Sequence, residues 1–294
     1  MKKRNLFLSV IALLTFAFSC SGNDDTKKEE EIKDPINNYF PGEVKPQAYF
    51  QCFPGAYYRK VVSSKDTWLG IGGKVILPQI SFDPDRINPA KPKQYLDNPS
   101  LYLGGNANGQ ETDIGMTWEV IRDQNGTVTA DRRAFRPFLR RTGYKGTGQE
   151  ANYMNAPAED RYYWYQGDEI EISLEVVRDG WILFTVEGAG KKYQQEYQCD
   201  GYKLNSKIEF KRVNAIDQVA NEGKPAQPTK TKVENSLWKE SYLFRMYNNE
   251  LVKAPIHSGR FTDMRCPDVK YFSITASDEE KKKGGETINI DAGI

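Results

Sequence analysis

The chain is poor in histidine, with His257 the only one among 294 residues. A metal site built from several histidines is therefore excluded, and a Ser-His-Asp triad would have to use His257, yet no Gly-x-Ser-x-Gly turn is present. The sequence also lacks a Gly-x-x-x-x-Gly-Lys-Ser/Thr phosphate loop and a Gly-x-Gly-x-x-Gly fingerprint. These absences argue against nucleotide use, and we expect no cofactor.

An excess of charge of one sign is missing as well. The 41 Lys and Arg residues are balanced by 40 Asp and Glu residues, which gives a net charge of +1. A nucleic-acid-binding protein would show a strongly basic face, so no nucleic-acid partner is expected.

Cysteine is scarce and widely spaced, which excludes a Cys-x-x-Cys redox or zinc motif. If Cys20 carries a lipid, three cysteines remain, so at most one disulfide forms within the chain. The sequence leaves open which two of Cys52, Cys199 and Cys266 would pair.

The apolar run at residues 6–18 is too short for a membrane-spanning helix, which needs about 20 residues. It follows Met1-Lys-Lys-Arg and precedes Ser19-Cys20, which is typical of a secretory signal. Residues 17–20, Ala-Phe-Ser-Cys, resemble a bacterial lipobox, although Ala17 stands where Leu is common. The resemblance implies a lipidated Cys20 and a membrane partner; an ordinary cleaved signal with an incidental cysteine is the alternative. Residues 21–25 resemble the acidic tag that places some Gram-negative lipoproteins on the cell surface, so we expect an outer-membrane location facing outward.

The segment after Cys20 is charged, contains proline and has no apolar period. We therefore expect a signal peptide at residues 1–20, a solvated tether at 21–45 and one domain at 46–294.

Strand-like alternation organises the remaining sequence. In residues 169–187, apolar side chains alternate with polar ones on both sides of an Asp179-Gly180 pair. A three-residue loop at 178–180, with Gly180 at φ > 0, puts one apolar face together by pairing Val176 with Ile182, Leu174 with Phe184 and Ile172 with Val186.

Residues 111–121 form a second clear strand. One face of this strand is expected in the core and carries Ile114, Met116, Trp118 and Val120. The opposite face is expected to be exposed to solvent and carries Glu111, Asp113, Thr117 and Glu119. Other strands are expected at 47–53, 68–77, 134–141, 193–197, 207–213, 236–244, 271–275 and 287–290. Pro137 suggests an edge position for 134–141, and 214–221 could form a short helix. The predicted fold class is all-β, a two-layer antiparallel sandwich.

Residues 111–118, the aromatic strand leading into 166–170, and the hairpin after it resemble the concanavalin-A-like lectin/glucanase sandwich, a jelly roll. The resemblance covers residues 101–244 and is one of fold, which does not determine function. Glycosidases of this class carry Glu-x-Asp-x-Glu on one strand. Glu111 and Asp113 match, but the third acid is missing, and Glu119 lies about 20 Å beyond Asp113 at 3.3 Å per residue. Carboxyl pairs in glycosidases are at most about 9.5 Å apart, so catalysis by Glu111 and Asp113 would need a partner from a neighbouring strand. Glutamic peptidases also share this sandwich and use a Glu and a Gln, for which Gln110 and Glu119 are weak candidates.

The aromatic run at residues 162–165 is the other candidate for a site. Alternation sends Tyr162 and Trp164 to one side and Tyr163 and Tyr165 to the other, so one pair packs in the core and the other faces solvent. Exposed aromatics beside charged groups suit sugar rings, and a purely core role is the competing interpretation. The ligand-binding residues that we predict are Trp164, Tyr162, Asp113, Arg136 and Arg140.

These patterns favour a lipid-anchored envelope protein that binds a glycan or a surface protein without catalysis. A glycoside hydrolase that uses carboxylates on the sheet is the alternative. Asp83, Asp85 and Asn88 offer oxygens that could suit calcium, but two prolines and the lack of a turn glycine argue against such a site, and we expect no metal.

Overall fold

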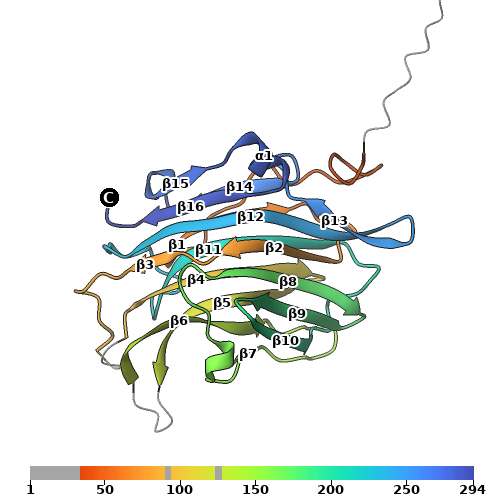
Figure 1. The fold of residues 1–294 in the computed structure, drawn as a ribbon. Helices are drawn as coiled ribbons and strands as arrows, with labels where there is room; N and C mark the ends of the chain where they lie inside the picture. The colour runs from red at the N-terminus through yellow and green to blue at the C-terminus, as the bar shows by residue number, and fades with distance from the viewer. Residues whose placement is uncertain (1–33, 90–93, 123–127) are drawn as a thin grey trace, which may run out of the picture. The chain divides into compact units, whose positions relative to one another are not determined.

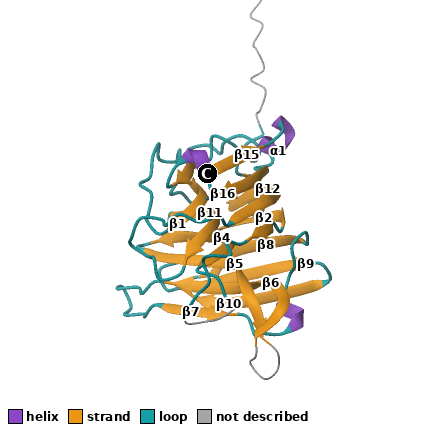
Figure 2. Cartoon of the chain, turned by 90° about the vertical axis from the view of Figure 1, so that its left-hand side faces the viewer, coloured by secondary structure: helices purple, strands orange, loops and turns teal. Residues whose placement is uncertain are grey.

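The computed structural model describes residues 34–294, apart from residues 90–93 and 123–127. The predicted signal peptide, Cys20 and the export-tag residues lie outside the described residues. The strands of the described part pair antiparallel in two sheets that face each other (Figures 1 and 2). The predicted all-β, two-layer antiparallel sandwich is thus confirmed.

Seven strands form the first sheet, in the order β14-β1-β11-β4-β5-β6-β7. Their bounds are β1 Ala56–Ser63, β4 Asp97–Ala107, β5 Gln110–Arg122, β6 Val128–Arg141, β7 Asn152–Asn155, β11 Ile208–Gln218 and β14 Phe261–Cys266.

The second sheet has nine strands, in the order β10-β9-β8-β2-β12-β16-β15, with β3 and β13 also paired to β12. Their bounds are β2 Gly70–Ile76, β3 Gln79–Ser81, β8 Glu169–Arg178, β9 Trp181–Gly188, β10 Lys191–Gln198, β12 Lys232–Tyr247, β13 Glu250–Pro255, β15 Phe272–Thr275 and β16 Glu286–Asp291. In the described residues, helical structure is limited to two 3₁₀ turns, Asp160–Tyr162 and Val269–Tyr271, and to α1, Asp278–Lys282. No helix within residues 34–294, as described, has the length and apolar character to cross a membrane.

The main core lies between the two sheets. Trp68, Trp164, Trp238, Phe184 and Phe210 are all completely buried in it. A strand alternates its side chains, so the other face of the seven-stranded sheet is free to carry a site. As predicted, Ile114, Met116 and Trp118 of β5 point into the core.

The predicted hairpin register is confirmed: Val176 pairs with Ile182, Leu174 with Phe184 and Ile172 with Val186. The turn itself differs from the prediction. Arg178 pairs directly with Trp181, so the loop has two residues, and a bulge beside Val177 takes up the extra residue. Gly180 has φ = 79°, as the tight turn requires.

Three predicted elements are wrong. Residues 47–53 form no strand; they are irregular, and the first strand begins at Ala56. Residues 214–218 continue β11 and form no helical turn, because Asn214 and Gln218 are polar residues buried on its inner face, which disguises the strand alternation. The strand around Pro137 lies one position inside the edge. The carbonyl of Pro137 accepts a hydrogen bond from the Ala156 N–H on the β7 side. The N–H that proline lacks would point to that same side, so no hydrogen bond to β5 is lost.

Residues 34–45, which the prediction assigns to the tether, pack onto the sandwich. Phe40 is buried in the core, and the fully buried Arg260 forms an ion pair with Glu43, whose side chain is 3% exposed. Charge and proline content alone suggested solvation for this segment, and contacts with the core and with Arg260, in the loop between β13 and β14, override that signal.

Candidate functional site

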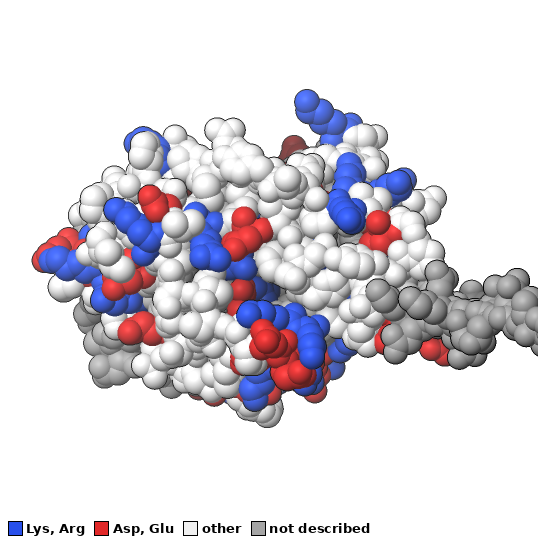
Figure 3. Space-filling view, turned by 90° about the horizontal axis from the view of Figure 1, so that it is seen from above, with Lys and Arg blue, Asp and Glu red and all other residues white. Residues whose placement is uncertain are grey.

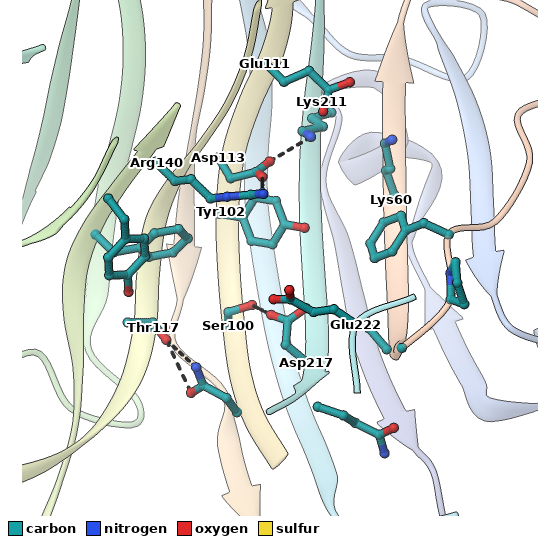
Figure 4. A pocket seen from close by; sticks show the side chains of 18 of the residues that line it. Lys60, Ser100, Tyr102, Glu111, Asp113, Thr117, Arg140, Lys211, Asp217 and Glu222 are labelled. Carbon is teal, nitrogen blue, oxygen red and sulfur yellow. Dashed lines mark hydrogen bonds and ion pairs between the residues drawn. The ribbon is translucent and has the colours of Figure 1, made fainter. Parts of the chain in front are cut away.

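A pocket of about 690 Å³ lies on the outer face of the seven-stranded sheet (Figure 4). Strands β1, β4, β5, β6, β7 and β11 supply its floor, because their outward side chains come from the alternate positions to those that fill the core. The loops at residues 53–55 and 222–223 border it. Both acidic and basic side chains project from this floor.

Asp113 forms the centre of an ion-pair cluster at one end of the pocket. Its Oδ2 accepts a bond from Arg140 Nη1 at 2.8 Å, and its Oδ1 lies 2.7 Å from Lys211 Nζ. Burial opposes ionisation of Asp113, but the charges of Lys211 and Arg140 outweigh it and lower the pKa of the carboxyl. Asp113 is therefore a fixed anion that holds two cationic side chains in place.

Asp217 lies at the other end and is shifted in the opposite direction. Ser100 Oγ donates to its Oδ2 at 2.6 Å. Burial, together with the negative charges of Asp113 and Glu222, raises the pKa of Asp217 to about 6. Figure 4 places the Glu222 carboxyl beside that of Asp217. This end of the pocket therefore holds a carboxyl that takes up a proton near neutral pH.

Aromatic rings lie between and beside these two ends. The ring of Tyr102 occupies the middle of the floor (Figure 4), with Phe138 6.0 Å away between ring centroids. Tyr153 stacks beside Phe138 and is 55% exposed. Tyr102 lies across Gly115 of β5, where a Cβ would come 2.5 Å from the Tyr102 Cβ. The lack of a side chain at Gly115 thus allows β5 to approach Leu101 and Tyr102 of β4 this closely.

A disulfide fixes one wall of the pocket. Cys52 and Cys266 are joined, which settles the pairing that the sequence leaves open, and Cys199 is a buried free thiol. The disulfide is followed at once by Phe53, Pro54 and Gly55, which line the pocket. Phe53 stacks on Tyr58 with ring centroids 4.1 Å apart.

The structure brings together part of the predicted site. Glu111, Asp113 and Arg140 all line the pocket, whereas Arg136 lies on the same strand outside the lining. The expectation that Trp164 is an exposed binding residue is wrong. Trp164 is 0% exposed, and its indole N–H donates to the Gly188 carbonyl inside the sandwich.

Tyr162 likewise packs against the core and contacts Tyr193 edge-on, away from the pocket. In the Tyr162–Tyr165 run it is Tyr165 that is exposed. Gln110, the peptidase candidate, is buried and donates to Thr142 and Gln149, so it takes no part in the pocket. The side chain of Glu119 lies outside the described residues.

Several pocket residues were missed from the sequence. The alternation of residues 207–213 carried a signal for Glu209 and Lys211, because both fall on the face opposite Ile208 and Phe210. Asp217 was hidden by the interpretation of 214–221 as a helical turn. The sequence did not indicate Tyr102 and Tyr153 as pocket residues, since tyrosines in strands occur both in cores and at surfaces.

Within the described residues, no three His, Cys, Asp or Glu side chains are placed to hold a metal ion. Asp83, one of the calcium candidates, instead accepts bonds from the backbone N–H groups of Asp85 and Lys230.

Fold and pocket together define a β-sandwich protein with a charged, aromatic-lined pocket on the outer face of one sheet. No protein-family model and no curated protein matches the sequence. Among solved structures, scytalido-glutamic peptidase with a transition-state analog inhibitor matches at 9% identity and a TM-score of 0.43, over 79% of this chain and 97% of that one. The laminarinase catalytic domain from Thermotoga maritima matches at 14% identity and a TM-score of 0.33, over 66% and 78%. A glycoside hydrolase family 16 endo-glucanase from Bacteroides ovatus matches at 12% identity and a TM-score of 0.30, over 58% and 75%. The two-sheet sandwich itself is established by the strand pairing.

Proposed function

We propose that the pocket on the seven-stranded sheet binds a carbohydrate without chemical change. The observation that carries this proposal is the exposed Tyr153 ring on the same face as the ion-paired Arg140, Asp113 and Lys211. The C–H faces of a sugar stack on aromatic rings, and its hydroxyls hydrogen-bond to charged groups.

The ion pairs around Asp113 favour binding over catalysis. A carboxylate held by both Arg140 and Lys211 is a poor base and a poor nucleophile, but it keeps two donor-rich side chains in fixed positions. Such positioning before the ligand arrives reduces the entropy lost on binding. Glu111, at the same end of the pocket, adds a further acceptor.

The experiment is a glycan array with residues 34–294, comparing Tyr153→Ala with Tyr165→Ala. Both tyrosines are exposed, at 55% and 39%, but only Tyr153 lines the pocket. Binding should fall about tenfold or more for Tyr153→Ala and stay unchanged for Tyr165→Ala. An array without any bound glycan, or an equal loss in both variants, would contradict the proposal.

A second candidate is a glycoside hydrolase that uses the other end of the pocket. The observation in its favour is the pKa of Asp217, raised to about 6, beside Glu222, which suits a general acid with a partner carboxylate. The pair that the sequence suggested, Glu111 and Asp113, fits less well because Asp113 is held in ion pairs. Reducing-end release from polysaccharides, abolished by Asp217→Asn while binding persists, would establish this alternative.

We also propose that Cys20 is lipidated and that the protein is displayed on the outer face of a bacterial outer membrane. The support is the sequence of residues 1–25. Cys20→Ala should move the protein from the membrane to the soluble fraction. Protease added to intact cells should remove the domain, and survival of the domain would refute surface display.

A further inference from the structure

A second, smaller pocket of about 250 Å³ lies at the edge of the sandwich where β14, β15, β16 and α1 meet. Figure 3 looks onto this side of the molecule and shows Lys and Arg side chains mixed with Asp and Glu. The pocket shares no lining residue with the candidate glycan site. It is therefore a separate feature with its own chemistry.

Two buried arginines from the first sheet reach one carboxylate of the second sheet at the bottom of this pocket. Arg59 and Arg212 are each 3% exposed, and both bond to Glu286 of β16. Arg59 also bonds to Asp263 at 2.5 Å, and Arg212 packs over the ring of Trp238. Guanidinium groups buried side by side are costly unless anions match them.

The charges of the lining do not balance. Among the described residues that line the pocket, Arg59, Arg212 and Arg265 face two carboxylates, Asp263 and Glu286, and Asp263 is shared between Arg59 and Arg265. The fourth cation, Lys281, is itself paired with Asp278. The pocket thus retains about one positive charge, which suits one additional negative charge.

An unpaired hydrogen-bond donor in the pocket also favours an additional anion. Among the described residues, the Nε–H of Arg59 has no hydrogen-bond partner although it is buried. A buried donor without an acceptor is costly, and such groups often mark a site for a missing partner. Burial and the neighbouring charge of Arg59 also lower the pKa of Arg212 to about 10, opposed by Glu286. A second anion in the pocket would stabilise both guanidinium charges.

The remaining walls are apolar. Val61, Ile256, Phe261, Ile274 and Ala276 line the pocket, and Phe261 lies 5.7 Å from the Arg59 guanidinium. We propose that this pocket binds a small monocarboxylate, with its carboxylate toward Arg59 and Arg265 and its apolar part against Phe261 and Ile274. The pocket volume of about 250 Å³ is roughly eight times the 30 Å³ or so that one molecule occupies in liquid water. This leaves room for a short-chain or aromatic acid.

The test is a calorimetric and NMR titration of residues 34–294 with sodium benzoate in a buffer without carboxylates. Benzamide is the matched neutral probe, because it keeps the ring and loses the charge. Benzoate should bind saturably at one site and about tenfold or more tighter than benzamide. Absence of saturable binding, or equal affinity for the two probes, would overturn the proposal.

Variants locate the binding. Ala276→Trp fills the pocket from its wall and should abolish benzoate binding, and Arg265→Gln, at the exposed rim, should weaken it about tenfold. Lys60 lines the pocket on the seven-stranded sheet and not this one, so Lys60→Gln is the control and should leave benzoate binding unchanged. Arg59 is left intact, because its loss would endanger folding. Unchanged binding by Ala276→Trp, in a variant that melts normally, would refute the location even if benzoate binds elsewhere.

Discussion

Asp217 and Asp113 face the same pocket, and their surroundings push their pKa values in opposite directions. The pKa of Asp217 is raised to about 6, whereas that of Asp113 is lowered by Lys211 and Arg140. The folded state therefore holds the Asp217 proton through a range, from about 3.8 to about 6, in which the unfolded chain has released it. Because the folded state binds more protons there, the contribution of Asp217 to stability falls as pH rises through this window.

We predict that Asp217→Asn removes this pH dependence. The amide resembles the protonated carboxyl and still accepts the bond from Ser100, so the variant should match wild type near pH 4. At pH 7 it should be more stable, by at most about 3 kcal/mol for a shift of two units. Urea denaturation of both proteins at pH 4, 5.5 and 7 provides the measurement. Parallel pH profiles would show that Asp217 ionises normally in the folded protein.

For individual residues, the sequence predicted the side of a strand that a side chain occupies, but not whether that side is buried. Alternation along β5 and β6 placed Glu111, Asp113 and Arg140 on one face, and that face carries the pocket. Alternation also separated Trp164 from Tyr165 but could not say which side faces the core. Trp164 is buried because the second sheet covers it, and that covering depends on residues far away in the sequence.

At the scale of one element, the hairpin of β8 and β9 depends on its turn. Gly180 has φ = 79°, and an added Cβ would meet its nearest neighbours, atoms of Asp200, at 3.8 Å, so a side chain has room. The cost of a substitution is therefore one of backbone conformation. The apolar pattern predicted the register of this hairpin, but not the bulge at Val177, because the pattern does not distinguish a long loop from a short turn with a bulge.

We predict that Gly180→Val lowers the free energy of unfolding by about 1 kcal/mol or more, because a β-branched residue resists positive φ. Gly180→Asn is the matched control and should cost less, since asparagine adopts the left-handed region more readily. Thermal melting of both variants gives the comparison. Equal melting temperatures for valine and glycine would mean that the turn relaxes to negative φ.

The segment at residues 34–45 shows an element that composition misjudges. Its prolines and charges suggest a tether, yet Glu43 bonds to the fully buried Arg260, which also donates to the carbonyls of Pro35 and Ile36. The sequence does not show whether a charged residue such as Glu43 will form an ion pair with a buried residue. Only the fold, which brings Arg260 and the N-terminal segment together, supplies that information.

We predict that Glu43→Ala destabilises the domain by about 3–5 kcal/mol, because it leaves a buried arginine without its anion. Glu159→Ala removes a carboxylate from an exposed pair with Arg161 and serves as the control, with no measurable change expected. Urea denaturation gives the stabilities, and limited proteolysis should release residues 34–45 more readily in Glu43→Ala. A loss as small as that of the control would show that solvent reaches Arg260.

At the scale of the whole molecule, local patterns predicted the class of fold but not its long-range closures. The two-sheet arrangement followed from alternation and turns, whereas the Cys52–Cys266 disulfide joins positions 214 residues apart. Nothing local distinguishes Cys52 from Cys199, and the choice depends on β1 placing the loop after Cys52 next to β14.

We predict that replacing Cys52 and Cys266 by serine together costs about 5 kcal/mol, the chain entropy of a loop of this length. Glycan binding should weaken as well, because residues 53–55 form a wall of the pocket and would lose their covalent anchor. Cys199→Ser, which removes a thiol whose pKa burial raises to about 12, is the control and should leave glycan binding intact. Thiol labelling of residues 34–294 at pH 8 checks the assignment: the native protein should react at no cysteine, and the reduced protein should react at Cys52 and Cys266. Labelling of Cys52 or Cys266 in the native protein, or a double variant as stable as wild type, would contradict this account, because in either case the disulfide would not be what closes the sandwich and holds the wall of its pocket.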